Sequence, residues 1–221
     1  MFPDRHRQKP DPDRRYDRIY IGGDYGQQNA TTFEAFGLDT YRKKFPGLGE
    51  YYHSGRESGR QKSPSEYARD LVEFMDELHE QYENRIFYIF LDPSAKGLAE
   101  EVKRATRTGL DYQVLLRDAE NDVALGISRV QKALVFDIMS ISPKQEYAVQ
   151  EFGTYEYDKK SIEKGKEVPV KEADHCMDAI RYVVMGAWSK IKHLLPKDET
   201  PEEIDICDIS SREVREEDEY L

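Results

Sequence analysis

The hydrophobic and polar positions of this chain repeat with two different periods. Apolar residues over 67–82 recur every three or four positions, which predicts an amphipathic helix. The segment SPSE at 63–66 precedes it and combines a serine cap, a proline and a glutamate three residues after the cap, which is a helix-start signal. The run IFYIFL at 86–91 is apolar throughout, as expected of a central strand covered on both faces.

The remaining segments predict a mixed α/β domain. Three β-rich runs, RIYIGGDYG, TTFEAFGLD and GEYYHSG, precede the first helix, and turn residues separate them, so we expect a three-strand meander. After the central strand we expect a helix from about Gly97, a strand YQVLL, and helices over about 122–134, 143–152 and 174–192. Residues 153–171 resemble two strands joined by a polar loop. The order predicts a mixed central sheet flanked by helices.

Composition divides the chain into an arm, a domain and a tail. Residues 1–17 are rich in Pro, Asp and Arg and predict a linker or arm, 18–194 form the domain, and 195–221 form a flexible acidic tail. The tail holds eleven acidic and three basic residues, so it contributes 3 − 11 = −8 of the formal net charge of −11. An acidic chain normally argues against nucleic-acid binding, but residues 1–194 carry only −11 − (−8) = −3. The charge of the domain itself is therefore a weak objection to a nucleic-acid partner.

Membrane and secreted classes are not supported by the sequence. No uncharged apolar run approaches the roughly 20 residues that cross a bilayer, and the charged N-terminus lacks the apolar stretch of a secretory signal. The two cysteines, Cys176 and Cys207, support neither a disulfide framework nor a cysteine zinc site. We expect a protein of a reducing cytoplasm with no membrane partner.

Three aspartates stand where predicted elements end or begin. Asp24 closes the first strand, Asp92 closes the central strand, and Asp178 lies on the last helix. Converging carboxylates repel one another, so a divalent cation is their natural neutraliser. The pattern favours one or two Mg²⁺ or Mn²⁺ ions, and two such ions about 4 Å apart support phosphodiester hydrolysis.

Each of these residues also has a structural explanation. Asp24 can shape a turn, and Asp92, before a proline, can cap the following segment. Asp178 shares a helical face with Asp174 and His175, and Asp174 can act as a helix cap with the other two solvated. A lone histidine such as His175 is often structural, but beside Asp178 it can also reach a metal site or a phosphate.

Five segments together resemble a known family. GGDYG, GRQKSPSEYARDL, IFLDPSA, NDVALGISRVQKAL and VKEADHCMDAIRY, in this order, are similar to the C-terminal nuclease domain of the large terminase subunits of tailed bacteriophages, over about residues 18–188. The resemblance implies an RNase H-like fold and a metal-dependent endonuclease that cuts concatemeric viral double-stranded DNA during genome packaging. It assigns the metal-binding acidic triad to Asp24, Asp92 and Asp178, with His175 as their catalytic neighbour in the DHxxD pattern.

The resemblance also implies partners and a location. A large terminase works with an ATPase motor domain, a small terminase subunit and the portal, in the host cell cytoplasm. No GxxxxGK[ST] motif occurs in this sequence, so the motor itself is not expected here, and residues 1–16 become an interdomain linker. The resemblance does not explain the acidic tail, which can occupy a basic DNA groove, contact another packaging protein or solvate the chain end.

The sequence also allows two other functions and contains one candidate DNA-binding segment. Asp24-Tyr25-Gly26 followed by Thr31 resembles the phosphate-binding turn of actin-like ATPases, although the second such turn and the adenosine loop of that class are missing. A non-catalytic packaging or DNA-interaction module is a further alternative. Four lysines of one predicted loop can contact DNA phosphates without sequence choice, or can simply keep the hairpin soluble: Lys159, Lys160, Lys164 and Lys166.

Overall fold

The computed structural model describes residues 4–26, 29–155, 170 and 174–196. Its elements in chain order are a 3₁₀ turn at Asp4–His6, then β1 (Arg18–Asp24), β2 (Ala30–Leu38), β3 (Phe45–Ser54), α1 (Gly55–Ser58), α2 (Pro64–Tyr82), β4 (Ile86–Leu91), α3 (Lys96–Ala105), β5 (Gln113–Asp118), α4 (Val123–Val135), β6 (Met139–Ser140), α5 (Glu146–Thr154) and α7 (His175–Ile191).

The strands form one mixed sheet in the order β5-β4-β1-β2-β3-β6. Strands β1, β2 and β3 are antiparallel neighbours, so the predicted meander is confirmed. Strand β4 runs parallel to β1, and β5 runs parallel to β4. The carboxyl ends of β1, β4 and β5 therefore meet at one edge of the sheet.

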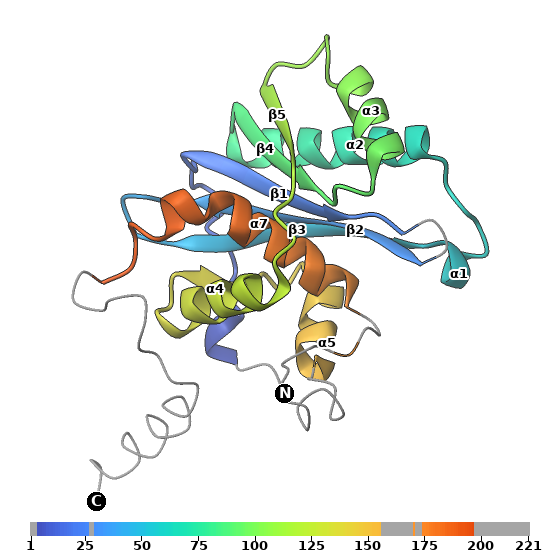
Figure 1. Cartoon of the computed structure of the whole chain (residues 1–221). Coiled ribbons are helices and arrows are strands. Elements are labelled where there is room, and N and C mark those ends of the chain that lie inside the picture. Colours follow the sequence, from blue (N-terminus) through green and yellow to red (C-terminus); the bar gives the residue numbers. More distant parts are fainter. Residues whose placement is uncertain (1–3, 27–28, 156–169, 171–173, 197–221) are drawn as a thin grey trace, which may run out of the picture.

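Helices cover both faces of this sheet (Figure 1). Alternate residues of β1 face opposite sides: Ile19 and Ile21 pack with α2 and α3, whereas Tyr20 packs with α4 and α7. Strand β4 divides in the same way, with Phe87 on the first side and Phe90 on the second. The expectation of a central strand covered on both faces is confirmed.

The start of α2 shows how local sequence sets an element. Ser63 Oγ accepts a hydrogen bond from the Glu66 N–H, and Glu66 Oε2 accepts one from the Ser63 N–H at 2.8 Å. Pro64 occupies the first helical position, where a missing N–H costs nothing. The helix then buries Leu71 and Met75 fully, each worth about 1.5–3 kcal/mol relative to exposure.

Two glycines allow helix α7 to pack directly against the sheet. A Cβ on Gly22 of β1 would stand 2.0 Å from the Ala179 carbonyl oxygen of α7. On the helix side, a Cβ on Gly186 would stand 2.3 Å from the ring of Phe90 on β4. The helix packs across β1, β2 and β4 (Figure 1). This contact fixes how far the residues of α7 lie from the ends of β1 and β4.

Some element boundaries differ from those expected. Helix α5 begins at Glu146, three residues late, and runs to Thr154, so residues 153–154 continue the helix instead of starting a strand. The rest of the expected two-strand segment lies outside the described residues, apart from positions 155 and 170. The short elements β6 and α1 were not predicted, because two and four residues are too few to display a period.

Residues before β1 make defined contacts with the domain. The Arg14 guanidinium donates to both carboxylate oxygens of Asp39, at 2.6 and 2.7 Å, and the Ile141 N–H donates to the His6 carbonyl at 2.7 Å. Tyr16 is buried against β2. The domain boundary at residue 18 stays a prediction, and residues 197–221 of the expected tail lie outside the described chain. No described helix is long and apolar enough to cross a membrane.

Candidate active site

Two of the predicted site residues lie side by side at the ends of parallel strands. Gly23 of β1 is the register partner of Leu91 of β4, and the Asp92 N–H donates to the Gly23 carbonyl at 3.3 Å. Asp24 is the last residue of β1, and Asp92 directly follows β4. Because side chains alternate along a strand, Asp24 shares the face of Gly22, which is the face covered by α7.

Helix α7 brings the other two predicted residues to the same edge. His175 Nδ1 lies 2.7 Å from Asp24 Oδ2 and forms a hydrogen bond with it. Further along the helix, the Tyr182 hydroxyl donates to Asp92 Oδ2 at 2.7 Å. Asp178 lies between these two contacts on the helix. The structure thus places Asp24, Asp92, Asp178 and His175 around one edge of the sheet.

The carboxylate of Asp178 is held by a buried arginine. Arg181 donates to Asp178 Oδ1 through Nη2 at 2.8 Å and through Nε at 3.2 Å, and it also donates to Asn121 Oδ1 at 3.0 Å. Arg181 is 2% exposed. A Cβ on Gly126 of α4 would stand 2.3 Å from Arg181 Cγ, so this glycine makes room for the side chain. The guanidinium supplies a positive charge beside the three aspartates.

The protonation of the site follows from burial and from these neighbours. Burial raises the pKa of Asp24, and the charges of Asp178 and Asp92 raise it further, against the opposing effect of His175. The hydrogen bond to Asp24 raises the pKa of His175 despite burial. Burial tends to raise the pKa of Asp92, but hydrogen bonds from Ser94 and Tyr182 lower it below its ordinary value. Mutual repulsion among the aspartates is therefore present at this edge.

The donor set at this edge fits a hard divalent cation. Three carboxylates supply the oxygen ligands that Mg²⁺ and Mn²⁺ prefer, and the charges of Asp178 and Asp92 add to the burial that raises the pKa of Asp24. Each carboxylate is presently held by a protein neighbour: His175, Tyr182 with Ser94, or Arg181. A different set of acidic residues is more compact in the part of the chain that the structure describes.

The more compact group includes Cys176, at the start of α7. Ligand atoms of Glu34, Glu50 and Cys176 fall within 4.8 Å of one another, the only such set of three among the residues described. Burial raises the pKa of Glu34 well above its ordinary range, and it raises the pKa values of Glu50 and the Cys176 thiol as well. Burial and the neighbouring Glu50 carboxyl therefore favour the protonated form of Glu34. A neutral acid and a protonated thiol fit a structural hydrogen-bond cluster better than a cation site.

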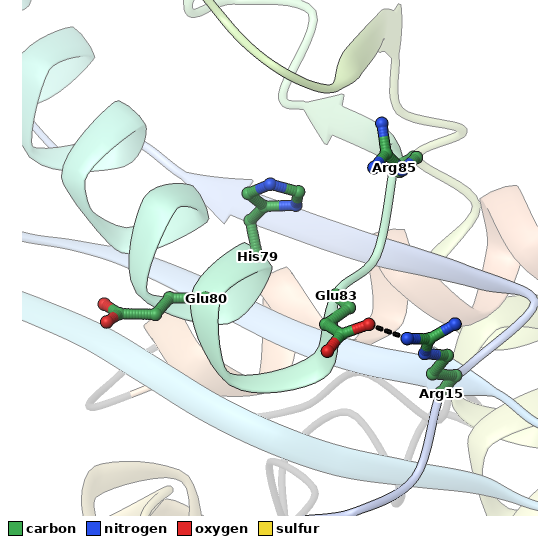
Figure 2. Close-up of a pocket in the computed structure, with 5 residues that line it drawn as sticks. All are labelled: Arg15, His79, Glu80, Glu83 and Arg85. Atoms are coloured by element: carbon green, nitrogen blue, oxygen red, sulfur yellow. Dashed lines mark hydrogen bonds and ion pairs between the residues drawn. The ribbon is translucent and has the colours of Figure 1, made fainter.

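A surface hollow of about 310 Å³ lies at the opposite end of the sheet (Figure 2). His79 and Glu80 come from the last turns of α2, Arg85 precedes β4, and Arg15 forms an ion pair with Glu83. Since β1 and β4 begin at this end and their aspartates close the other, the hollow is separate from the candidate active site.

The contacts of Asp92, Asp174 and His175 go beyond a purely structural role only in part. Asp92 does shape the turn after β4, because its Oδ1 accepts from the Ser94 N–H at 2.7 Å, but its other oxygen faces α7. Asp174 holds the N-cap position of α7, yet within the described chain its side chain makes no capping hydrogen bond. His175 and Asp178 are both partly exposed, and each forms a side-chain hydrogen bond, to Asp24 and Arg181 respectively.

Sequence reasoning missed several residues that hold the site. Arg181 and Tyr182 stand three and four positions after Asp178, a helical spacing that was available as a signal. Asn121 and Glu151 reach the site from other elements, and no spacing in the sequence indicates them. The four predicted DNA-contacting lysines lie outside the described residues: Lys159, Lys160, Lys164 and Lys166.

Comparison with solved structures places this architecture among known proteins. The large terminase of a thermophilic bacteriophage (crystal form 2) is 32% identical with a TM-score of 0.69, over 83% of this chain and 42% of that chain. The chain therefore spans less than half of that terminase. The P22 large terminase nuclease domain has a TM-score of 0.63 at 15% identity, over 89% of this chain and 95% of that one.

A third solved structure was determined with a metal. The large terminase nuclease domain of bacteriophage SPP1 with bound Mn has a TM-score of 0.50 at 18% identity, over 76% of this chain and 86% of that one. No protein-family model matches the sequence, and no curated protein does. The mixed sheet flanked by helices is thus the RNase H-like fold of terminase nuclease domains.

Proposed function

Because this chain belongs to the large terminase family and has the fold of its nuclease domains, we propose that it is a metal-dependent endonuclease that cuts viral double-stranded DNA during genome packaging. The observation that carries the proposal is the arrangement of Asp24, Asp92 and the first turn of α7 at one sheet edge. Three mutually repelling carboxylates destabilise a fold unless a cation neutralises them. Such cations can activate the attacking water and stabilise the leaving oxygen in phosphodiester hydrolysis.

We assign Asp24, Asp92 and Asp178 as the residues that would hold one or two Mg²⁺ or Mn²⁺ ions. When bound, these ions supply positive charge that activates water and stabilises the leaving oxygen. Arg181 orients the Asp178 carboxylate and partly offsets the negative charge of the site. The Mn-bound structure of the SPP1 nuclease domain, which shares this fold, makes Mn²⁺ the natural probe.

His175 is assigned to proton handling rather than to anchoring metal. Its Nδ1 shares a hydrogen bond with Asp24, and that bond raises the pKa of the imidazole. A protonated imidazole beside the scissile phosphate can donate to the leaving oxygen, and a neutral one can accept from the attacking water. We therefore expect His175 to accelerate cleavage while metal binding depends on the carboxylates.

The wider assignments follow from the family. We propose that the chain acts in the host cell cytoplasm on concatemeric DNA, together with an ATPase motor domain, a small terminase subunit and the portal. Lys159, Lys160, Lys164 and Lys166 are proposed to contact DNA phosphates without sequence choice. A non-catalytic DNA-interaction module is the alternative if cleavage is absent.

The test is cleavage of supercoiled plasmid by the purified chain with Mn²⁺ or Mg²⁺. We expect nicking with little sequence preference, abolished by EDTA and by Asp92→Asn. Asp111→Asn, the same chemical change at an exposed position near the start of β5, is the matched control and should cut as wild type does. Undiminished cleavage by Asp92→Asn would move the catalytic role to other residues.

A further inference from the structure

The first turn of α7 is fixed from outside the helix by a buried glutamate. Glu151 of α5 accepts hydrogen bonds through Oε2 from the backbone N–H groups of Cys176, at 2.7 Å, and Met177, at 3.1 Å. These two residues lie between His175 and Asp178 in the chain. Because the first N–H groups of a helix have no acceptor within the helix, a carboxylate that accepts from two of them determines where the helix starts.

A second glutamate fixes α5 in the same manner. Glu50 of β3 accepts from the backbone N–H groups of Tyr147, at 2.7 Å, and Ala148, at 3.1 Å, in the first turn of α5. Gln145, directly before that helix, donates to Glu34 of β2 at 2.8 Å. Helix α5 is thus tied to the sheet at its beginning, and its later part carries the carboxylate that holds α7.

We propose that Glu151 is a positioning residue of the nuclease, which sets His175 and Asp178 relative to Asp24 through the first turn of α7. The proposal rests on the proposed function, because it concerns the same site. Glu151 is 6% exposed, and its carboxylate accepts hydrogen bonds from the backbone of α7, so it positions the aspartates through this helix. Removing its carboxylate leaves two buried N–H groups without an acceptor, which loosens this turn.

The first turn of α7 also contacts the sheet, next to Asp24. Cys176 is fully buried, and its thiol lies 3.7 Å from the Thr32 hydroxyl of β2. Thr32 is the register partner of Asp24 across the β1–β2 ladder. The turn is therefore clamped between α5 on one side and the strand next to Asp24 on the other. A shift of the turn changes the distance from Asp178 to Asp24 directly.

Three variants test the proposal. Glu151→Ala removes the acceptor, Glu151→Gln keeps one acceptor oxygen without the charge, and Glu146→Ala removes the same side chain from an exposed position of α5 as the control. Each protein is compared by Mn²⁺ titration calorimetry, by kcat and KM for plasmid nicking, and by hydrogen exchange of the Cys176 and Met177 amides, at a temperature where circular dichroism shows it folded.

We expect Glu151→Ala to lower Mn²⁺ affinity and kcat by about 10–100-fold with KM for plasmid little changed, and to speed exchange of the two amides. Glu151→Gln should recover most of each loss, and Glu146→Ala should match wild type. If Glu151→Ala fails to fold, Glu151→Asp replaces it, since the shorter side chain withdraws the carboxylate while keeping its charge.

The outcomes separate this proposal from the proposed function. Wild-type Mn²⁺ affinity and kcat in folded Glu151→Ala or Glu151→Asp would overturn the positioning role, and so would unchanged exchange of the Cys176 and Met177 amides. If the wild-type chain itself neither cuts DNA nor binds Mn²⁺, the proposed function fails. The exchange measurement still decides whether Glu151 holds the first turn of α7.

Discussion

At the scale of single residues, Asp24 carries an electrostatic cost that its function would explain. Burial and the charges of Asp178 and Asp92 raise its pKa, so the ionised carboxylate is less stable in the folded chain than in water. The compensating partner is His175 at 2.7 Å. A residue kept under these conditions at a strand end is typical of a ligand site rather than of a turn.

We predict that Asp24→Asn abolishes cleavage while thermal stability stays equal or rises. The amide removes the buried charge, and its oxygen still accepts from His175 Nδ1. Asp24→Ala should also abolish cleavage but should be less stable than the Asn variant, because it loses that acceptor. Thermal melts in EDTA measure both. A fall in Tm of more than about 4 °C for Asp24→Asn, roughly 1 kcal/mol for a domain of this size, would contradict the electrostatic argument.

A second residue-scale prediction separates His175 from the carboxylates. Neutral imidazole is a poorer ligand than carboxylate for Mg²⁺, so His175→Ala should slow cleavage by about 10–1,000-fold while metal binding persists. Mn²⁺ calorimetry and plasmid nicking on one preparation test this. Complete loss of Mn²⁺ binding would make His175 a primary ligand, and wild-type cleavage would leave it a structural role beside Asp24.

At the scale of elements, the close approach of α7 to β1 sets the site, and Gly22 permits it. We predict that Gly22→Ala destabilises the domain by about 1–3 kcal/mol and weakens cleavage, because the new Cβ would lie 2.0 Å from the Ala179 carbonyl oxygen and must displace the helix. Gly49→Ala of β3 is the control, since its Cβ would be 3.5 Å from the Phe74 ring, an ordinary contact. Urea unfolding measures the stability of both variants. Equal free energies of unfolding for the two would show that α7 can shift without cost.

The buried carboxyl of Glu151 makes the stability of the packed helices α5 and α7 depend on pH. Burial raises its pKa to about 7, ahead of the opposing hydrogen bonds from α7. A carboxyl with a raised folded-state pKa binds its proton more tightly when folded, so its contribution to stability is full below about pH 4.5 and is lost as the pH rises to about 7. We predict that the free energy of unfolding of wild type falls by about 1–3 kcal/mol over this range relative to Glu151→Gln.

Urea titrations in EDTA at pH values from 5 to 8 would measure this difference. Subtracting the Glu151→Gln curve removes the contributions of titratable groups remote from Glu151 and leaves those of Glu151 and of its electrostatic coupling to His175. A difference that does not change with pH would mean that Glu151 is ionised throughout.

Elements that a local pattern specifies were predictable, and contacts across the fold were not. Helix α2 begins and ends where its cap and its period place it, and β4 matches its apolar run, because neighbouring residues determine both. The closeness of Asp24 and Asp92 could be expected from the sequence because both follow apolar strands, and the ends of parallel strands share one edge of a sheet. Glu151, by contrast, reaches α7 from 25 residues away, and only the packing of α5 brings it there.

At the scale of the whole molecule, charge is distributed unevenly. Residues 195–221 carry −8 of the formal net charge of −11. A block of like charge repels DNA phosphates within about one Debye length, roughly 10 Å at 0.1 M salt. The acidic segment is therefore expected to repel a DNA substrate, and this repulsion weakens as the ionic strength rises.

We predict that deleting residues 197–221, which removes the same three basic and eleven acidic residues, tightens DNA binding about threefold to tenfold at about 50 mM salt and much less at about 200 mM. Fluorescence anisotropy with a labelled duplex, in Ca²⁺ or EDTA to prevent cleavage, measures the affinity at both salt concentrations. A variant in which the eleven acidic residues become Asn or Gln keeps the chain length and should reproduce the deletion. If the deletion tightens binding equally at both concentrations, steric blocking rather than charge repulsion is its cause, and if it weakens binding, the segment itself contacts DNA.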